Sequence, residues 1–148
     1  MKPVDITRAG IVDAKILADL AIQMWADHAP EDLEAEFRQS AMSDEAVCFI
    51  KYAGDTPVAF AQCRLRHDYV EGTGSSPVGY LEGIFVLEGY RENGYAAQLL
   101  SECEKWAREK GCTEFASDCE LDNAAGFRFH TAVGFEEANR IICFRKDL

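Results

Sequence analysis

The chain has 148 residues, 48% hydrophobic and 28% charged, which is typical of one globular domain over residues 1–148. This composition excludes disordered and collagen-like chains, and no apolar run approaches the roughly 20 residues of a membrane helix. With 26 acidic and 15 basic residues, the formal net charge is −11. Such a charge disfavours nucleic acid and membrane lipid as partners, because both bind mainly through Lys and Arg. It favours cationic ligands, although solubility alone is an alternative explanation.

The six cysteines indicate reduced thiols and no metal site. None forms a C-x-x-C pair, and the three histidines lie near no cysteine cluster, so we expect no zinc. The N-terminus lacks an apolar leader. We therefore expect a cytoplasmic protein whose cysteines act mostly as small core residues.

The first part of the chain alternates two kinds of hydrophobic spacing. Apolar residues recur at helical spacing up to Trp25, and Pro30 begins a second helix with acidic residues in its first turn. Alternating apolar residues then predict strands. The expected elements are a strand over residues 4–7, helices over 14–25 and from 30, strands over 46–52, 57–66 and 79–86, and a polar loop over 67–77 before the last strand.

The second part contains the strongest helical stripe, which runs from Ala96 to a C-cap at Gly111. A strand over 114–119, a helix that begins at a cap formed by Asp122-Asn123 and runs to residue 132, and a terminal hairpin of 135–138 with 141–145 follow. The order β-α-α-β-β-β-α-β-α-β-β predicts a mixed α/β layer fold.

The segment R-E-N-G-Y-A, residues 91–96, lies between a strand and this helix. The first turn of a helix offers unpartnered N–H groups and a partial positive charge. Gly94 permits close approach of a ligand, and Arg91 adds a cation. The segment therefore suits a pyrophosphate, with an ordinary βα turn as the alternative.

The pattern V-x-x-x-Y-R-x-x-G-Y-A, residues 86–96, resembles the acetyl-CoA loop of the GCN5-related N-acetyltransferases. Asn123, His130 and Gly134-Phe135 resemble the C-terminal pattern of that family. The segments L-R-H-D-Y-V, S-S-P-V, L-E-G-I-F-V-L and F-A-S-D are similar to aminoglycoside 6′-N-acetyltransferases. The resemblance implies the family's mostly antiparallel sheet flanked by helices, acetyl-CoA as cofactor and a homodimer. Its implied cofactor-binding residues are Ile84, Val86, Arg91, Glu92, Asn93, Gly94, Tyr95, Ala96 and Asn123.

Two positions depart from the family pattern. Glu92 and Asn93 stand where the family often has bases, so we expect weaker cofactor affinity but not its loss. His130 stands where many members have a tyrosine that acts as general acid, which leaves the identity of the acid open.

Glu82 is the candidate general base. It is the only carboxylate within an apolar strand, and desolvation there favours proton uptake. The alternative is a structural pair with Arg64 or Arg66, which is compatible with a role as base.

Asp118 is the second candidate catalytic residue. It ends a strand within residues 114–122, a run with four acids and no base, and carboxylates bind ammonium groups by charge-assisted hydrogen bonds. The alternative is a solvated acidic strand end. The candidate substrate-binding residues are Trp25, Asp68, Tyr69, Glu82, Asp118 and Glu120, although Trp25 also fits a core position.

Together with these residues, the resemblance implies an acetyl-CoA-dependent enzyme that acetylates the 6′-amine of aminoglycosides, by direct transfer in a ternary complex and with no metal. One alternative is the same chemistry on another cationic amine, such as a polyamine or lysine. The other is a non-catalytic acyl-CoA-binding domain, which has no need of a buried base.

Overall fold

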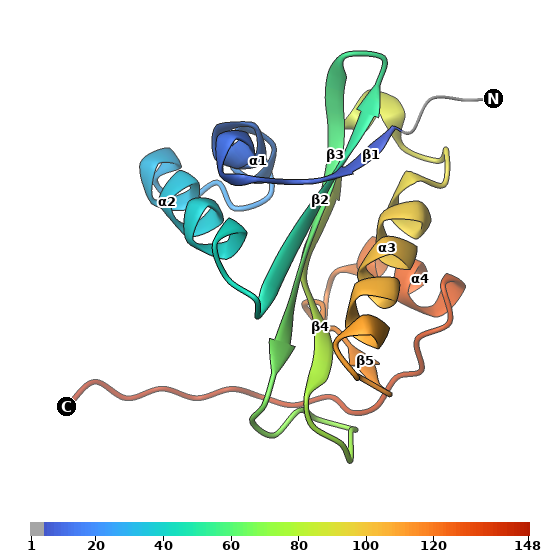
Figure 1. Ribbon diagram of the computed structural model, residues 1–148. Coiled ribbons are helices and arrows are strands. Elements are labelled where there is room, and N and C mark those ends of the chain that lie inside the picture. Colours follow the sequence, from blue (N-terminus) through green and yellow to red (C-terminus); the bar gives the residue numbers. More distant parts are fainter. Residues whose placement is uncertain (1–4) are drawn as a thin grey trace.

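One sheet divides the molecule into two helical layers (Figure 1). The computed structural model describes residues 5–148, and within them five strands lie in chain order, β1-β2-β3-β4-β5. Neighbours from β1 to β4 are antiparallel, whereas β4 and β5 are parallel. The strands are β1 (Ile6–Arg8), β2 (Ala46–Ala53), β3 (Thr56–Arg66), β4 (Val78–Val86) and β5 (Phe115–Ala116).

Helices α1 and α2 cover one face of the sheet, and α3 and α4 lie on the other side (Figure 1). The α-helices are α1 (Ala14–Ala21), α2 (Pro30–Ala41), α3 (Tyr95–Glu109) and α4 (Ala124–Ala132), and short 3-10 helices span Ile11–Asp13 and Glu88–Tyr90. This arrangement confirms the predicted mixed α/β fold with a mostly antiparallel sheet.

The alternation of β3 decides which side chain enters which layer. Ala59, Ala61 and Cys63 pack with α3, whereas Phe60 packs with α1 and α2. Successive side chains of a strand point to opposite faces, so one strand supplies both cores. The predicted stripe of α3 is also confirmed, because Leu99, Leu100, Cys103, Trp106 and Ala107 are buried.

Some boundaries differ from the sequence prediction. Regular helix ends at Ala21 instead of Trp25, and turn hydrogen bonds such as Trp25 N to Ala21 O carry the chain onward. The first strand spans Ile6–Arg8, while Val4 lies outside the described residues. Strand β5 has two residues instead of six, because its ladder with β4 stops at Tyr80 and Ala116.

The predicted terminal hairpin is wrong: residues 135–148 contain no strand. Phe135 still packs against the core. The second half of the expected hairpin finds no strand partner among residues 5–148, and the chain runs away from the body to its C-terminus (Figure 1).

Candidate active site

Both residues of β5 pair with the beginning of β4, and the sheet opens beyond that point. The paired residues are Gly79 with Phe115 and Tyr80 with Ala116. From there β4 continues to Val86, paired with β3 on its other side. In this stretch, which includes Ile84 and Val86, β4 has a neighbouring strand on one edge only. Backbone groups that point to the other edge are therefore open to a ligand. An extended ligand can add to such an edge.

The segment that follows β4 fits a phosphate group. Gly94 is the N-cap of α3 with φ 78°, in the left-handed region, and no side chain caps the helix. A Cβ at Gly94 meets nothing within 4 Å, so the space over this turn is open. The uncapped N–H groups of a 15-residue helix therefore face an accessible surface.

The side chains of the loop itself fold back onto its backbone. Arg91 Nε donates to Val86 O at 2.9 Å, and Asn93 Nδ2 donates to Tyr90 O at 2.9 Å. Glu92 has φ 65°, a second left-handed position beside Gly94. The side chains of Arg91 and Asn93 thus shape the turn, and the phosphate donors expected here are backbone groups.

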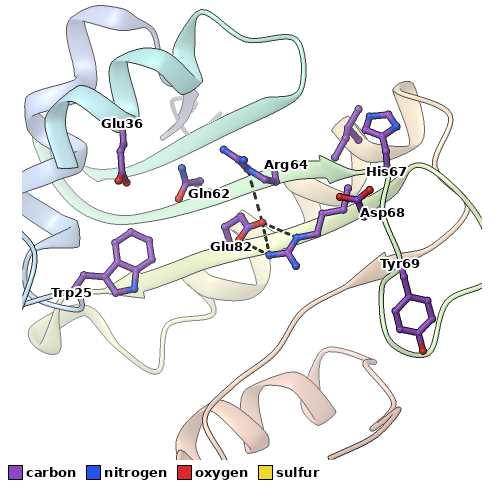
Figure 2. Close-up of a pocket in the computed structure, with 10 residues that line it drawn as sticks. Trp25, Glu36, Gln62, Arg64, His67, Asp68, Tyr69 and Glu82 are labelled. Carbon is purple, nitrogen blue, oxygen red and sulfur yellow. Dashed lines mark hydrogen bonds and ion pairs between the residues drawn. The ribbon is translucent and has the colours of Figure 1, made fainter. Parts of the chain in front are cut away.

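A pocket of about 610 Å³ lies on the α1–α2 side of the sheet (Figure 2). This volume falls in the range of small-molecule sites. Four of the predicted substrate-binding residues line it: Trp25, Asp68, Tyr69 and Glu82. Asp118 and Glu120 do not. The other lining residues are Glu36, Gln62, Arg64, Leu65, Arg66 and His67.

Trp25 acts both as core and as pocket wall. Its ring packs edge-on against Phe60, with ring centroids 6.3 Å apart. Its ring also lies directly over Gly83 of β4, where an added Cβ falls 2.8 Å from the indole carbons. The glycine beside Glu82 therefore makes room for the indole, which the sequence pattern did not indicate.

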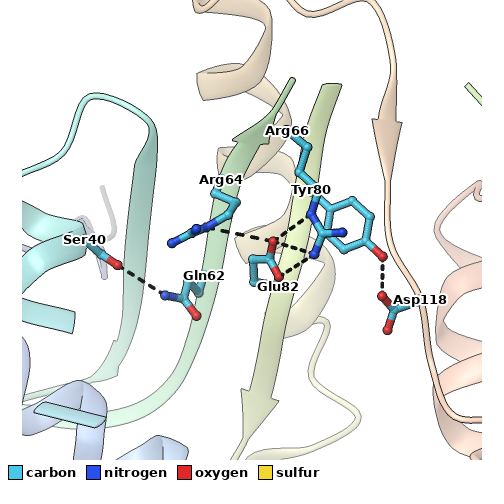
Figure 3. A network of polar contacts seen from close by, with 7 residues as sticks. All are labelled: Ser40, Gln62, Arg64, Arg66, Tyr80, Glu82 and Asp118. Atoms are coloured by element: carbon cyan, nitrogen blue, oxygen red, sulfur yellow. Dashed lines mark hydrogen bonds and ion pairs between the residues drawn. The ribbon is translucent and has the colours of Figure 1, made fainter. Parts of the chain in front are cut away.

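Glu82 is paired, as the alternative interpretation held (Figure 3). Arg66 binds its carboxylate through two nitrogens: Nε to Oε1 at 3.1 Å, and Nη2 to Oε1 and Oε2 at 2.9 and 3.0 Å. Arg64 Nε lies 3.9 Å from Oε1. The Glu82 side chain keeps 22% of its surface exposed. The pocket therefore holds a paired carboxylate, and its polar lining is mixed in charge.

Tyr80 connects this pair to the opening between β4 and β5 (Figure 3). The Arg66 guanidinium lies 3.5 Å from the centroid of the Tyr80 ring, and the Tyr80 hydroxyl donates to Asp118 Oδ2. Burial, followed by the hydrogen bond to Asp118, raises the pKa of Tyr80 well above its usual value, so the phenol stays protonated and donating. A continuous polar chain thus joins Asp118 to Glu82.

Sequence reasoning did not assign Tyr80 to the site. The available signal was its spacing, because Tyr80 and Glu82 are two residues apart in one strand and therefore share a face. For Arg66, the sequence indicates only a pairing with Glu82.

The Acetyltransferase (GNAT) family model matches residues 14–135, which are most of the chain and include the site residues described above. The chain belongs to the GNAT acetyltransferase family. An aminoglycoside N(6′)-acetyltransferase type 1 of Serratia marcescens is 42% identical over 130 residues, which cover 87% of this chain and 89% of the relative. The enzyme of the same name from Stenotrophomonas maltophilia is 42% identical over 144 residues, covering 97% and 93%.

Solved structures agree with this membership. AAC(6′)-Iy in complex with the bisubstrate analogue CoA-S-monomethyl-acetylneamine has a TM-score of 0.93 and 38% identity, covering 97% of this chain and 98% of that one. The apo enzyme AAC(6′)-IG from Acinetobacter haemolyticus has a TM-score of 0.92 and 33% identity, covering 98% and 99%. The GNAT fold predicted from the sequence is thereby confirmed.

His130, the departure from the GNAT tyrosine, is bonded through both ring nitrogens. Its Nδ1 lies 2.6 Å from Gly126 O, and its Nε2 lies 2.7 Å from Ser117 Oγ. Because a carbonyl only accepts, Nδ1 carries a proton, and in the neutral ring Nε2 accepts from the Ser117 hydroxyl. His130 thus ties α4 to the end of β5 beside Asp118. Sequence reasoning missed Ser117.

The remaining predicted residues lie apart from the pocket. Asn123 caps α4 through Oδ1, which accepts from Gly126 N at 2.9 Å, so the cap predicted at Asp122-Asn123 is confirmed and is formed by Asn123. Glu120 is exposed in the turn after β5. Glu114 bonds instead to Gly74 N at 2.9 Å and to Ser75 Oγ at 2.5 Å. Within residues 114–122, Glu114 therefore holds the loop at residues 74 and 75, whereas Asp118 binds Tyr80.

Residues 5–148 contain neither a cluster of metal ligands nor a helix that could span a membrane. No set of three or more His, Cys, Asp or Glu side chains is placed to hold a metal ion. No helix in this part of the chain combines the length and apolar character needed to cross a membrane.

Proposed function

We propose that this GNAT chain, acting as one domain, transfers the acetyl group of acetyl-CoA to the 6′-amine of aminoglycosides. The observation that carries the proposal is the position of the pocket. Glu82, Trp25 and Tyr69 line a pocket on β4, the strand whose open edge leads towards the uncapped start of α3. The names of the relatives and the bisubstrate complex of AAC(6′)-Iy support the same chemistry.

Acetyl-CoA brings an activated acetyl thioester to the site. The backbone at Gly94, Tyr95 and Ala96 holds its pyrophosphate, because these groups open an uncapped helix. The open edge at Ile84 and Val86 holds the pantetheine arm and directs N–H groups at the thioester oxygen. Arg91, Glu92 and Asn93 shape the loop, and Asn123 borders the same side of the sheet.

The acceptor lies in the pocket with its amine towards β4. Trp25 and Tyr69 supply flat walls for sugar rings, and Asp68 supplies a negative charge. Asp118, with Glu120 farther along the same turn, binds ammonium groups that reach the opening between β4 and β5. The net charge of −11 attracts such a polycation over a longer range.

Glu82, directly or through one water, takes a proton from the 6′-ammonium. The freed nitrogen lone pair then attacks the thioester carbon, so that the N–C bond forms, the C–S bond breaks and the sulfur leaves with the bonding pair. As the amide forms, the nitrogen loses a second proton. One of the two protons ends on the thiolate, and Glu82 releases the other to solvent. Arg66 positions Glu82, and Tyr80 positions Asp118.

We further propose a homodimer in the cytoplasm. All six cysteines are free, and four of them are buried. This state suits a reducing compartment.

Release of the CoA thiol from acetyl-CoA tests the proposal when followed across acceptor classes. The sharpest comparison is a pair of aminoglycosides that differ only in a 6′-amino against a 6′-hydroxyl group. We expect thiol release with the first and none with the second. Faster release with polyamines or lysine peptides contradicts the acceptor class, and no release with any amine contradicts catalysis.

A further inference from the structure

Lys51 is a charged residue inside the molecule, only 3% exposed. In β2 it shares a face with Val47 and Phe49, which pack in the layer of α3. Lysine is almost never fully buried unless it is paired, because removing an ammonium group from water costs free energy. Apolar residues of similar volume often replace a buried ion pair without loss of stability, so stability alone does not explain this ammonium.

The Lys51 ammonium connects the residue before β1 to the start of α3. Its Nζ lies 2.7 Å from Asp5 Oδ2 and donates to Gln98 Oε1 at 2.9 Å. It also lies 4.5 Å from the centroid of the Tyr95 ring, in the range of a cation–π contact. Gln98 N donates in turn to Gly94 O at 3.1 Å. Lys51 therefore contacts the first residue of α3 and the residue whose backbone closes the turn over Gly94.

The first turn of α3 contributes no fully buried side chain to the core. The buried residues of the helix begin at Leu99 and end at Ala107, whereas residues 95–98 are exposed or only partly buried. Phosphate binding at this turn needs backbone N–H groups that are already held in one orientation, because a ligand that must first order its site loses affinity. The polar contacts of Lys51 supply this order where apolar packing does not.

The charge of Lys51 also favours an anionic ligand at this turn. The start of a helix carries a partial positive charge, so a cation beside it is unfavourable by itself. Asp5 offsets part of this repulsion. A pyrophosphate on the first turn is attracted both by the helix start and by Lys51, and salt screens a buried charge much less than an exposed one.

We propose that Lys51 is a positioning residue for acetyl-CoA: it fixes Tyr95 and Gln98, so that the first turn of α3 presents its N–H groups to the pyrophosphate. Lys51 acts through the turn and does not need to touch the cofactor. The inference rests on the proposed pyrophosphate site at residues 94–96 and names a residue of another element that holds this site in place. The pattern of residues 91–96 does not indicate it, because Lys51 lies in β2.

The first experiment is Lys51→Met, which keeps most of the side chain but removes the charge and the N–H donors. We expect the acetyl-CoA dissociation constant, measured by calorimetry, to rise about 10-fold, the scale of one hydrogen bond. Lys15→Met is the matched control, because Lys15 pairs with Asp19 on the exposed surface of α1 and the substitution removes the same charge. Its acetyl-CoA affinity should equal that of wild type.

A second acetyl donor separates positioning of the turn from general damage to the fold. S-acetylpantetheine carries the same thioester as acetyl-CoA but lacks the pyrophosphate. With one aminoglycoside as acceptor, Lys51→Met should lower kcat/KM for acetyl-CoA about 10-fold and leave kcat/KM for S-acetylpantetheine unchanged. Equal losses with the two donors mean that Lys51 supports the fold as a whole, and they overturn the proposal.

Gln98→Leu tests the same contact from the other side and decides the matter if Lys51→Met does not fold. Gln98 is exposed, so the variant should fold, and it removes the oxygen that accepts from Lys51. We expect acetyl-CoA to bind about 3-fold more weakly. Wild-type affinity in Gln98→Leu or in folded Lys51→Met overturns the proposal.

Gly94→Val distinguishes failure of this inference from failure of the proposed phosphate site. If Gly94→Val weakens acetyl-CoA binding and Lys51→Met does not, only the role of Lys51 is wrong. If neither substitution weakens binding, the phosphate site is wrong as well. The calorimetric measurement needs no acceptor, so neither result depends on the aminoglycoside.

Discussion

The start of α3 and the pocket on β4 are built by different means. The start of α3 relies on backbone groups of one short segment: a left-handed Gly94 and an uncapped helix. The pocket relies on side chains from α2, β3, β4 and two loops that are far apart in sequence. A site made of backbone groups can be predicted from a local sequence motif and tolerates changes of side chain. A site made of side chains forms only after folding and depends on each residue that lines it.

The largest expected effect is a loss of turnover when Glu82, the candidate base in the pocket, is replaced. Glu82→Gln keeps the shape of the side chain but removes the proton acceptor, so kcat should fall about 10²–10⁴-fold. Acetyl-CoA affinity, measured by calorimetry, should not change. The control Glu102→Gln breaks another carboxylate pair, with Lys105, on the outer face of α3 and should leave kcat intact. Wild-type turnover in Glu82→Gln assigns Glu82 a structural role only.

Removing the negative charge of Asp118, beside β5, should have the next largest effect on activity. Asp118→Asn retains an acceptor oxygen for Tyr80 but loses its charge, and a charged hydrogen bond contributes about 1.5–3 kcal/mol. We expect kcat/KM for a 6′-amino aminoglycoside to fall roughly 10–150-fold. Tyr80→Phe is the matched variant, because it removes the hydrogen bond and keeps the charge. An equal loss in both variants means that positioning, not charge, is what Asp118 needs.

The packing of Trp25 over Gly83 can be tested by adding one methyl group at residue 83. Gly83→Ala places a Cβ 2.8 Å from the indole and forces it to move. Overpacking of this kind costs about 1–3 kcal/mol, visible in chemical denaturation, and the displaced wall should raise the KM for the acceptor. Gly89→Ala is the control, since nothing lies within 4 Å of its added Cβ. An unchanged KM in Gly83→Ala removes Trp25 from the acceptor site.

The cofactor loop should respond to backbone conformation. Gly94→Val puts a β-branched residue at φ 78°, where left-handed backbone costs about 1–2 kcal/mol, so acetyl-CoA should bind about 5–30-fold more weakly. Gly94→Asn tolerates this conformation better and should lose less. Equal affinity in all three forms, with α3 intact by circular dichroism, contradicts a phosphate site at this turn.

The smallest effect concerns the loop of residues 67–77, which carries Asp68 and Tyr69. Hydrogen bonds from Ser75 and Gly74 lower the pKa of Glu114 below its usual 4.5. The folded state therefore gains stability that is complete above the unfolded pKa and is lost as pH falls through the lowered folded pKa. Glu114→Gln should flatten this acid-side part of the stability curve. If wild type and Glu114→Gln have identical pH profiles of the melting temperature, the hydrogen bonds of Glu114 do not contribute to stability.

The sequence was most informative where contacts are local. The α3 stripe, the alternation of β3 and the cap at Asn123 depend on neighbours three or four residues away or on strand periodicity, so they were predictable. The sequence alone does not decide whether Glu82 pairs with Arg64 or Arg66, because the partner depends on the register of β3 against β4. Tyr80, Ser117 and the fit of Trp25 over Gly83 arise only from packing between distant segments.

The terminal hairpin was wrong for a related reason. Residues 141–145 do have a strand pattern, but a pattern does not say whether its partner belongs to the same chain. Within residues 5–148 this segment pairs with no strand, and Ile142 and Phe144 stay exposed.

The account's central claim is that the cofactor loop and the acceptor site, which comprises the pocket and Asp118 beside it, are separately built. A double-mutant cycle tests this most directly: the acetyl-CoA dissociation constant and the aminoglycoside KM are measured for wild type, Gly94→Val, Asp118→Asn and the double variant. We predict that Gly94→Val changes only the dissociation constant, that Asp118→Asn changes only KM, and that the double variant shows both losses unaltered, within about 0.5 kcal/mol of additivity. A change of both constants by either single substitution contradicts the claim.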